Sequence, residues 1–262
     1  MPSLVCIVVG IVAGIAGGFF GVGGGVIIVP FLILALRFEQ HRAQGTSLLA
    51  LALPVAGVGA YNYWVEGKTN VAVGLCIAAG IALGSFFGSR IALGVSASTM
   101  RKAFCVFLTV IAAYLFFKND LLHLQSTDLS GDLPAWAYPV SVLAGLLAGL
   151  TGGLFGVGGG VIAVPFTVLA FGFPQHLAQG TSLLALTLPV AAFGAYNYHR
   201  KGNVDVRAGI CIALGIVGGG YLGSKFALGL EPVTMQRAFS VFVVTMAAYL
   251  FFKKQPKSPL PV

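Results

Sequence analysis

The two halves of the chain carry the same sequence at a fixed spacing, and this duplication limits the fold more than any other feature. Three strings recur about 135 residues later without a gap: GVGGGVI at 21–27 and 156–162, QGTSLLAL at 44–51 and 179–186, and AYNY at 60–63 and 195–198. Roughly 60% of the paired positions between Gly14 and Lys118 are identical, which chance similarity between two apolar segments does not produce. The chain must therefore fold as two copies of one unit.

The repeated unit is too apolar for a water-soluble protein. The chain is 58% hydrophobic and 8% charged, and its mean hydropathy is +0.96. A soluble domain carries about 25% charged residues, so the polar surface that such a fold needs is missing. We expect an all-α polytopic protein of the inner (plasma) membrane, with the lipid bilayer as its main partner. The net charge of +8 belongs to loops and predicts no nucleic-acid binding, because no basic helix face accompanies it.

Each half contains five apolar segments. Those of the first half are Leu4–Phe20, Gly25–Leu36, Gln44–Tyr63, Val71–Ile91 and Met100–Phe117. Those of the second half are Tyr138–Phe155, Gly160–Phe171, Gln179–Tyr198, Val206–Phe226 and Met235–Phe252. A crossing needs about 20 residues, so the second segment of each half, at about 12, is short enough for a broken or re-entrant helix. The predicted domains are a first repeat at 1–118, a connecting loop at 119–136, a second repeat at 137–254 and a C-terminal tail at 255–262.

The positions of lysine and arginine predict how the repeats are oriented. If each repeat makes an odd number of crossings, the copies are inverted, and about 11 of the 15 basic residues share one side of the membrane. With an even number the copies are parallel, and the basic residues divide about 7 against 8. Cytoplasmic loops carry an excess of Lys and Arg, so we expect inverted repeats with both termini in the cytoplasm. The number of full crossings stays open.

The glycine-rich string of each repeat has two interpretations. Small residues let membrane helices approach closely. Three adjacent glycines, however, cost a helix interior about 1 kcal/mol each relative to alanine, which favours a break within the membrane. A half-helix that starts after such a break attracts anions to its N-terminus. The candidate contacts at these termini are Gly24, Gly25, Val26, Gly159, Gly160 and Val161. A dinucleotide site is excluded because no strand precedes the glycines and no βαβ unit follows them.

A polar cluster opens the third segment of each repeat. Capping of a helix at the membrane interface is one explanation. A ligand pocket is the other, since amides and hydroxyls bind an oxyanion without a buried counter-charge. Pro54 and Pro189 are expected to kink these segments. Because each cluster follows a glycine break, both are expected to converge on a pseudo-twofold axis near the membrane midplane. The candidate binding residues are Gln44, Thr46, Ser47, Gln179, Thr181 and Ser182, with Asn62 and Asn197 at the far ends of the same segments.

Other polar residues of the repeat also have two interpretations each. The tyrosines beside the two asparagines are typical of an interfacial aromatic belt. His41 and His176 are expected to be solvated loop residues, with proton transfer as the alternative. Arg90 and Lys225 end an apolar segment, where they extend towards the membrane surface or attract a charged substrate.

Several missing motifs narrow the class of function. No carboxylate lies inside a clear apolar segment, whereas cation exchangers and proton pumps usually need one there. The sequence has no Walker A motif, no Cys/His cluster with metal spacing and no nucleophile paired with a base, so we expect no enzyme activity, cofactor or metal. We therefore predict a secondary transporter for a small anion. The alternatives are an anion channel, a carrier of a small carboxylate, and a membrane enzyme or an assembly partner for one.

The order of these motifs resembles that of the TauE/SafE family of membrane transporters. In both repeats Val-Pro follows the glycines, and Gln-Gly-Thr-Ser begins about 14 residues after that proline. The resemblance covers nearly the whole chain. It implies export of a sulfur-containing anion such as sulfite or sulfoacetate, with the polar clusters as candidate contacts. It leaves open which anion is carried, whether protons or sodium are coupled, and whether the carrier forms a homodimer.

Overall fold

The computed structural model describes residues 2–121 and 133–229, and beyond them residues 241, 244, 245, 247, 248 and 250–252. The first two ranges form helices and contain no strand. The helices are α1 (Pro2–Phe20), α2 (Gly25–Ala35), α3 (Gln40–Ala52), α4 (Gly57–Val65), α5 (Val71–Leu93), α6 (Ala97–Leu121), α7 (Ala137–Phe155), α8 (Gly160–Phe171), α9 (Gln175–Thr187), α10 (Ala192–Arg200) and α11 (Val206–Leu228).

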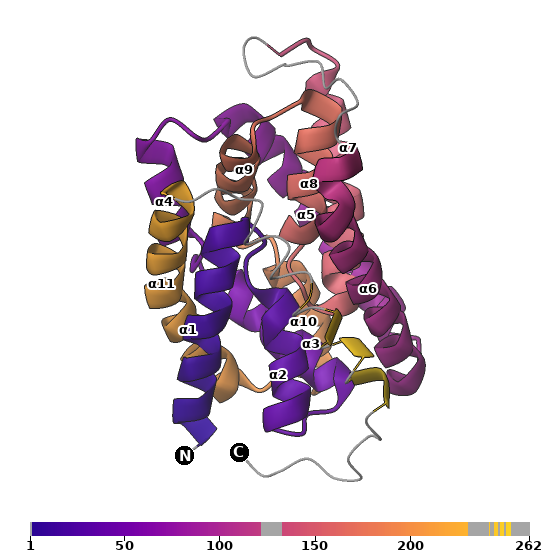
Figure 1. The fold of residues 1–262 in the computed structure, drawn as a ribbon. Helices are drawn as coiled ribbons and strands as arrows, with labels where there is room; N and C mark the ends of the chain where they lie inside the picture. Colours follow the sequence, from indigo (N-terminus) through magenta and orange to yellow (C-terminus); the bar gives the residue numbers. More distant parts are fainter. Residues whose placement is uncertain are drawn as a thin grey trace.

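Helices α7 to α11 repeat α1 to α5, with matching order and nearly identical lengths. In Figure 1, α1 rises from the lower end of the molecule, whereas its counterpart α7 descends from the upper end. The predicted all-α membrane fold with inverted repeats is therefore confirmed. Most of the predicted last segment, Met235–Phe252, lies outside the described residues.

Among the described residues, five helices are long and apolar enough to cross a membrane, and each of two bent helix pairs adds one more candidate crossing. A helix of 20 residues is about 30 Å long, which matches the hydrocarbon core of a bilayer. The outer faces of these helices carry large apolar side chains; for example, Leu83 of α5 is 58% exposed and Leu214 of α11 is 65% exposed. Lipid is the environment that such side chains favour.

The third predicted segment of each repeat is a broken helix. It starts four residues earlier than predicted, at Gln40 and Gln175, and the axes of its two parts differ by 47°. The break between α3 and α4 contains Pro54, and that between α9 and α10 contains Pro189. Proline lacks a backbone N–H and cannot continue the hydrogen-bond ladder, so the predicted kinks are confirmed.

The short second segments are the helices α2 and α8, of 11 and 12 residues. At about 1.5 Å per residue they are too short to cross the bilayer. Each packs against the helix that precedes it, and Figure 1 shows α2 lying beside α1. The prediction of broken or re-entrant helices at the glycine motifs is confirmed.

Glycines also bring the two repeats together. Helix α1 packs along α11 of the other repeat, and α7 packs along α5. A Cβ atom on Gly14 would lie 2.6 Å from the Ile216 carbonyl oxygen, and one on Gly149 would lie 2.7 Å from the Ile81 Cα. Close packing and helix breaking therefore both occur, at different glycines of one string.

Candidate functional site

Each glycine string ends in a tight loop that starts a new helix. Gly24 caps α2 and Gly159 caps α8, with φ angles of 87° and 98°. These values lie in the left-handed region of backbone conformation, which residues other than glycine adopt at a cost of about 1–2 kcal/mol. Because Gly25 and Val26 open α2, their N–H groups have no acceptor within the helix.

The two loops cross at the centre of the molecule. A Cβ atom on Gly25 would lie 2.5 Å from the Val157 Cα, and one on Gly160 would lie 2.8 Å from the Val22 Cα. The N-termini of α2 and α8, one from each repeat, therefore lie close together. Helix N-termini carry a partial positive charge, so two of them at one point favour an anion there.

A serine from the opposite repeat holds each loop. Ser47 of α3 donates a hydrogen bond of 2.7 Å to the Gly156 carbonyl oxygen. Ser182 of α9 donates one of 2.8 Å to the Gly21 carbonyl oxygen. Both serines are buried, and both hydroxyl hydrogens are used by these bonds. Their clear role is to fix the breaks relative to α3 and α9.

The two glutamines lie against the same loops. Gln44 and Gln179 are 0% and 2% exposed. The Gln44 Oε1 atom is 3.2 Å from the hydroxyl of Tyr198 and 3.3 Å from the Nδ1 atom of His41. The Gln179 Oε1 atom has the equivalent neighbours, Tyr63 and His176, each at 3.2 Å.

One polar group in this cluster has no partner. The Nε2 atom of Gln44 is buried and makes no hydrogen bond to any described residue. A buried donor without an acceptor costs about 1–3 kcal/mol, so such groups are uncommon in folded proteins. The Oε1 atom of the same amide accepts a hydrogen bond from the Tyr198 hydroxyl, and its Nε2 atom is left without an acceptor among the described residues.

The threonines of the two clusters serve a different purpose. The Thr46 hydroxyl accepts a hydrogen bond of 2.9 Å from the backbone N–H of Asp205. The Thr181 hydroxyl accepts one of 3.0 Å from the backbone N–H of Asn70. Each threonine thereby ties its helix to the loop that precedes α11 or α5. The structure does not place them with the glutamine amides, although the sequence grouped them together.

The two asparagines also lie apart from the glutamines. Asn62 donates to the Ser224 hydroxyl and Asn197 to the Ser89 hydroxyl, each at 2.9 Å. These bonds link α4 to α11 and α10 to α5. Asn197 also lines a separate cavity at one end of the molecule.

A family model for the sulfite exporter TauE/SafE matches residues 5–152 and again residues 140–261. The chain belongs to this family. It is 28% identical to the probable membrane transporter protein YdhB of Bacillus subtilis, over 95% of this chain and all of that protein. The probable membrane transporter protein YunE of the same organism is 25% identical, over 97% of this chain and 98% of that protein.

A more distant relative comes from Methanocaldococcus jannaschii. Its probable membrane transporter protein MJ0441 is 22% identical over 93% of both chains. No solved structure matches the chain. The resemblance indicated by the motifs is confirmed, and the relatives of this TauE/SafE protein are described as membrane transporters.

The sequence did not reveal the role of two tyrosines in this TauE/SafE protein. Tyr61 and Tyr196 are 58% and 56% exposed, as expected for an aromatic belt. Tyr63 and Tyr198 are fully buried and contact the glutamines, so the belt interpretation is wrong for them. The two tyrosines of each pair are two residues apart, and residues at this spacing lie on different faces of a helix. This spacing is the sequence signal that one tyrosine of each pair is exposed and the other is buried.

The structure also corrects the predicted position of the two histidines. They are not loop residues, because His41 lies in the first turn of α3 and His176 in the first turn of α9. Each is partly buried and has its Nδ1 atom close to a glutamine of the same helix. Their spacing of three residues from the glutamine is the sequence signal, since such pairs share a helix face.

The cavity beside the first glycine loop of this TauE/SafE structure is small. A cavity of about 10 Å³ lies beside the first glycine loop, between α1, α4, α9 and α11. A space of this size holds about one water molecule. A larger ligand therefore requires the surrounding helices to move apart.

Proposed function

We propose that this protein exports a small sulfur oxyanion, such as sulfite or an organosulfonate, from the cytoplasm by alternating access. The anion binds where the two glycine loops cross, between the amides of Gln44 and Gln179. Both termini lie in the cytoplasm, and the protein is in the plasma membrane. The observation that carries this proposal is the buried, unpartnered Nε2 donor of Gln44, which packs against Gly156 in the loop that leads into the half-helix α8.

The chemistry of the centre favours an anion over a cation. The groups that the glutamines and half-helices offer are N–H donors, and no carboxylate is among the described buried polar residues. A cation would need oxygen ligands or a negative charge at this depth. A small oxyanion instead takes hydrogen bonds from amides, as at other helix N-termini.

The arrangement of the repeats favours a carrier. In transporters with inverted repeats, the substrate lies at the interface of the repeats, between half-helices. Here each repeat contributes one helix pair bent by 47°, and these bends support a carrier whose two halves move against each other. When the cytoplasm is electrically negative relative to the outside, the membrane potential drives anion efflux with about 2.3 kcal/mol per charge per 100 mV. Export therefore needs no ATP.

The glutamines are tested by anion flux in proteoliposomes. The flux through wild-type protein is measured for sulfite, sulfoacetate, thiosulfate, sulfate, acetate and chloride, and sulfite is kept under anaerobic conditions. We expect saturable flux of a sulfur oxyanion and a loss of at least tenfold in Gln44→Ala/Gln179→Ala, because each missing charge-assisted amide bond is worth about 1.5–3 kcal/mol.

The matched control is Thr167→Val. Thr167 is a buried hydroxyl of α8 that bonds only to carbonyls of its own helix, at 3.1 and 3.0 Å. Its substitution is expected to leave flux within twofold of wild type. Unchanged flux in the glutamine variant would remove the site from this account, and flux of carboxylates alone would replace the substrate class.

A further inference from the structure

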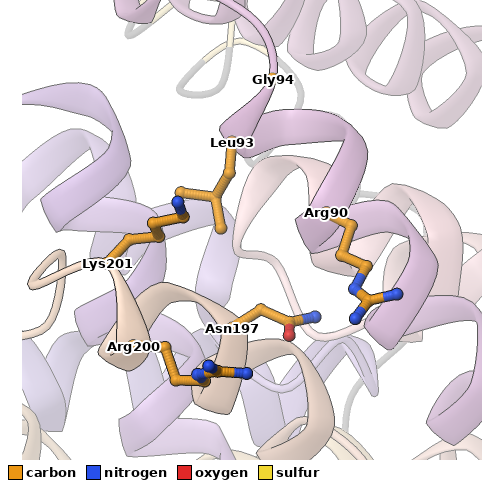
Figure 2. A pocket seen from close by; sticks show the side chains of 6 residues that line it. All are labelled: Arg90, Leu93, Gly94, Asn197, Arg200 and Lys201. Carbon is orange, nitrogen blue, oxygen red and sulfur yellow. The ribbon is translucent and has the colours of Figure 1, made fainter.

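A second polar cavity lies at one end of the molecule, outside the central site. It has a volume of about 450 Å³ and lies where α5 and α10 end. Figure 2 shows the side chains that line it: Arg90, Leu93, Gly94, Asn197, Arg200 and Lys201. We call this cavity the basic pocket.

The charge of the basic pocket is uncompensated. Three of its six lining residues are cationic, and none is acidic. Within residues 2–121 and 133–229, the one ion pair joins Arg42 to Asp205, so Arg90, Arg200 and Lys201 have no carboxylate partner there. Clefts lined by one sign of charge raise the local concentration of the opposite ion.

Two of the lining side chains are held in place. The guanidinium of Arg90 lies over the Phe86 ring, 4.4 Å from its centroid. The Asn197 amide is 8% exposed and donates to the Phe86 carbonyl oxygen at 3.0 Å and to the Ser89 hydroxyl at 2.9 Å. Figure 2 shows the Arg90 and Arg200 side chains extending on either side of this amide. A fixed guanidinium binds an oxyanion without losing further side-chain freedom.

The other repeat lacks this pocket's charge. The residues equivalent to Arg90, Arg200 and Lys201 are Lys225, Val65 and Glu66. One cation and one carboxylate therefore stand where the basic pocket has three cations. The asparagine and its serine partner are kept in both repeats, with the same bond length of 2.9 Å. The structural bonds are thus duplicated, whereas the positive charge is present at one end only.

The basic pocket adjoins the central cluster. Gly94 lines the pocket, and the carbonyl oxygen of the next residue, Val95, lies 3.0 Å from the Nε2 atom of His41. The other ring nitrogen of His41 faces Gln44. On α10, Asn197 lines the pocket while its neighbour Tyr198 contacts Gln44. A ligand in the pocket is therefore a few side chains away from the central amides.

We propose that the basic pocket is a capture site for a small oxyanion, separate from the central site and present on one face of the membrane only. That face carries most of the basic residues and is therefore cytoplasmic. The pocket concentrates the anion at the side from which it is exported. That the captured anion is also the transported anion rests on the proposed function. The phosphate of an anionic lipid shares this chemistry, and the experiment separates the two sources.

The test compares Arg200→Gln/Lys201→Gln with wild type in inside-out membrane vesicles, where the basic pocket faces the medium. We expect the apparent KM for sulfite to rise about tenfold at low ionic strength while the maximal rate stays within twofold. The difference should shrink in about 0.5 M salt, because the charges are then screened. Lys102→Gln, which removes an exposed cation from the same face outside the pocket, should leave KM within twofold.

An unchanged KM in the double variant, or an equal rise in Lys102→Gln, would overturn the capture site and leave the central site untouched.

Native mass spectrometry tests whether the ligand of the basic pocket is a lipid. Phosphatidylglycerol that stays bound to wild type and is lost from the double variant, with KM unchanged, would assign the pocket to lipid. If wild type transports none of the anions, the proposed function fails, and binding of inorganic sulfate in detergent still decides the pocket. Sulfate should raise the unfolding temperature of wild type more than that of the double variant.

Discussion

At the residue scale, the geometry of the central site depends on how the side-chain amide of Gln44 is held. Tyr198 and His41 both approach the Oε1 atom of Gln44, and the amide nitrogen on its other side stays unpaired. The tyrosine hydroxyl also reaches the Gly153 carbonyl oxygen at 3.1 Å. One hydroxyl thus joins α10 of one repeat to α3 of the other and to the last turn of α7, and its role is to position these helices.

Tyr198→Phe removes this hydroxyl and leaves buried acceptors without a donor. We expect a loss of stability of about 1–3 kcal/mol, measured by thermal unfolding in detergent. Tyr196→Phe is the control, because Tyr196 is 56% exposed on the same helix and its change should stay within about 0.5 kcal/mol. Equal unfolding temperatures for the two variants would contradict this role for Tyr198.

The residue scale is also where sequence reasoning was least complete. The repeat predicted that Gln44, Ser47 and their counterparts converge, and the structure does bring them to crossing loops. It could not show that each cluster serves the loop of the other repeat, since a periodic pattern gives a helix face but not its partner. The threonines differ from the serines in their contacts for the same reason. Only the fold determines which neighbour each face meets.

At the element scale, the helices were predictable because length and hydropathy act over many residues. Helix breaks followed from adjacent glycines and from Pro54 and Pro189, which disrupt the hydrogen-bond ladder wherever they lie. Contacts between helices follow from glycines too, but the sequence does not say which helix approaches. In the structure, α1 and α11 come close enough that a single Cβ atom would collide with a backbone.

Adjacent glycines of α11 test this contact. A Cβ atom on Gly219 would meet the Ile11 carbonyl group, whereas one on Gly218 has nothing within 4 Å. We expect Gly219→Ala to destabilise the protein by about 1–3 kcal/mol through overpacking. Gly218→Ala should be neutral or stabilise it by up to about 1 kcal/mol, because alanine is the better helix former. Thermal unfolding of the two variants compares them directly, and the reverse order would contradict the packing of α1 on α11.

At the scale of the whole molecule, the proposed transport requires that the two repeats face opposite sides of the membrane. Sequence predicted this from the distribution of basic residues, and the opposite courses of α1 and α7 agree with it. The charge difference between the ends has a functional meaning only if the basic end is cytoplasmic.

Cysteines at two equivalent positions test this orientation. Glu66 and Lys201 occupy the same place in the two repeats, and both are exposed. In a background without the four native cysteines, we expect Lys201→Cys to react with an impermeant maleimide in inside-out vesicles only. Glu66→Cys should react in right-side-out vesicles only. Reaction of both from one side would mean parallel repeats.

Sulfite counter-flow distinguishes a carrier for a sulfur oxyanion from a channel. Proteoliposomes are loaded with unlabelled sulfite, kept anaerobic, and diluted into a trace of labelled sulfite. A carrier with alternating access exchanges the two, so the label should accumulate transiently above its equilibrium level, and Gln44→Ala/Gln179→Ala should abolish this. Downhill flux without transient accumulation would indicate a channel, and no sulfite flux at all would contradict the substrate class.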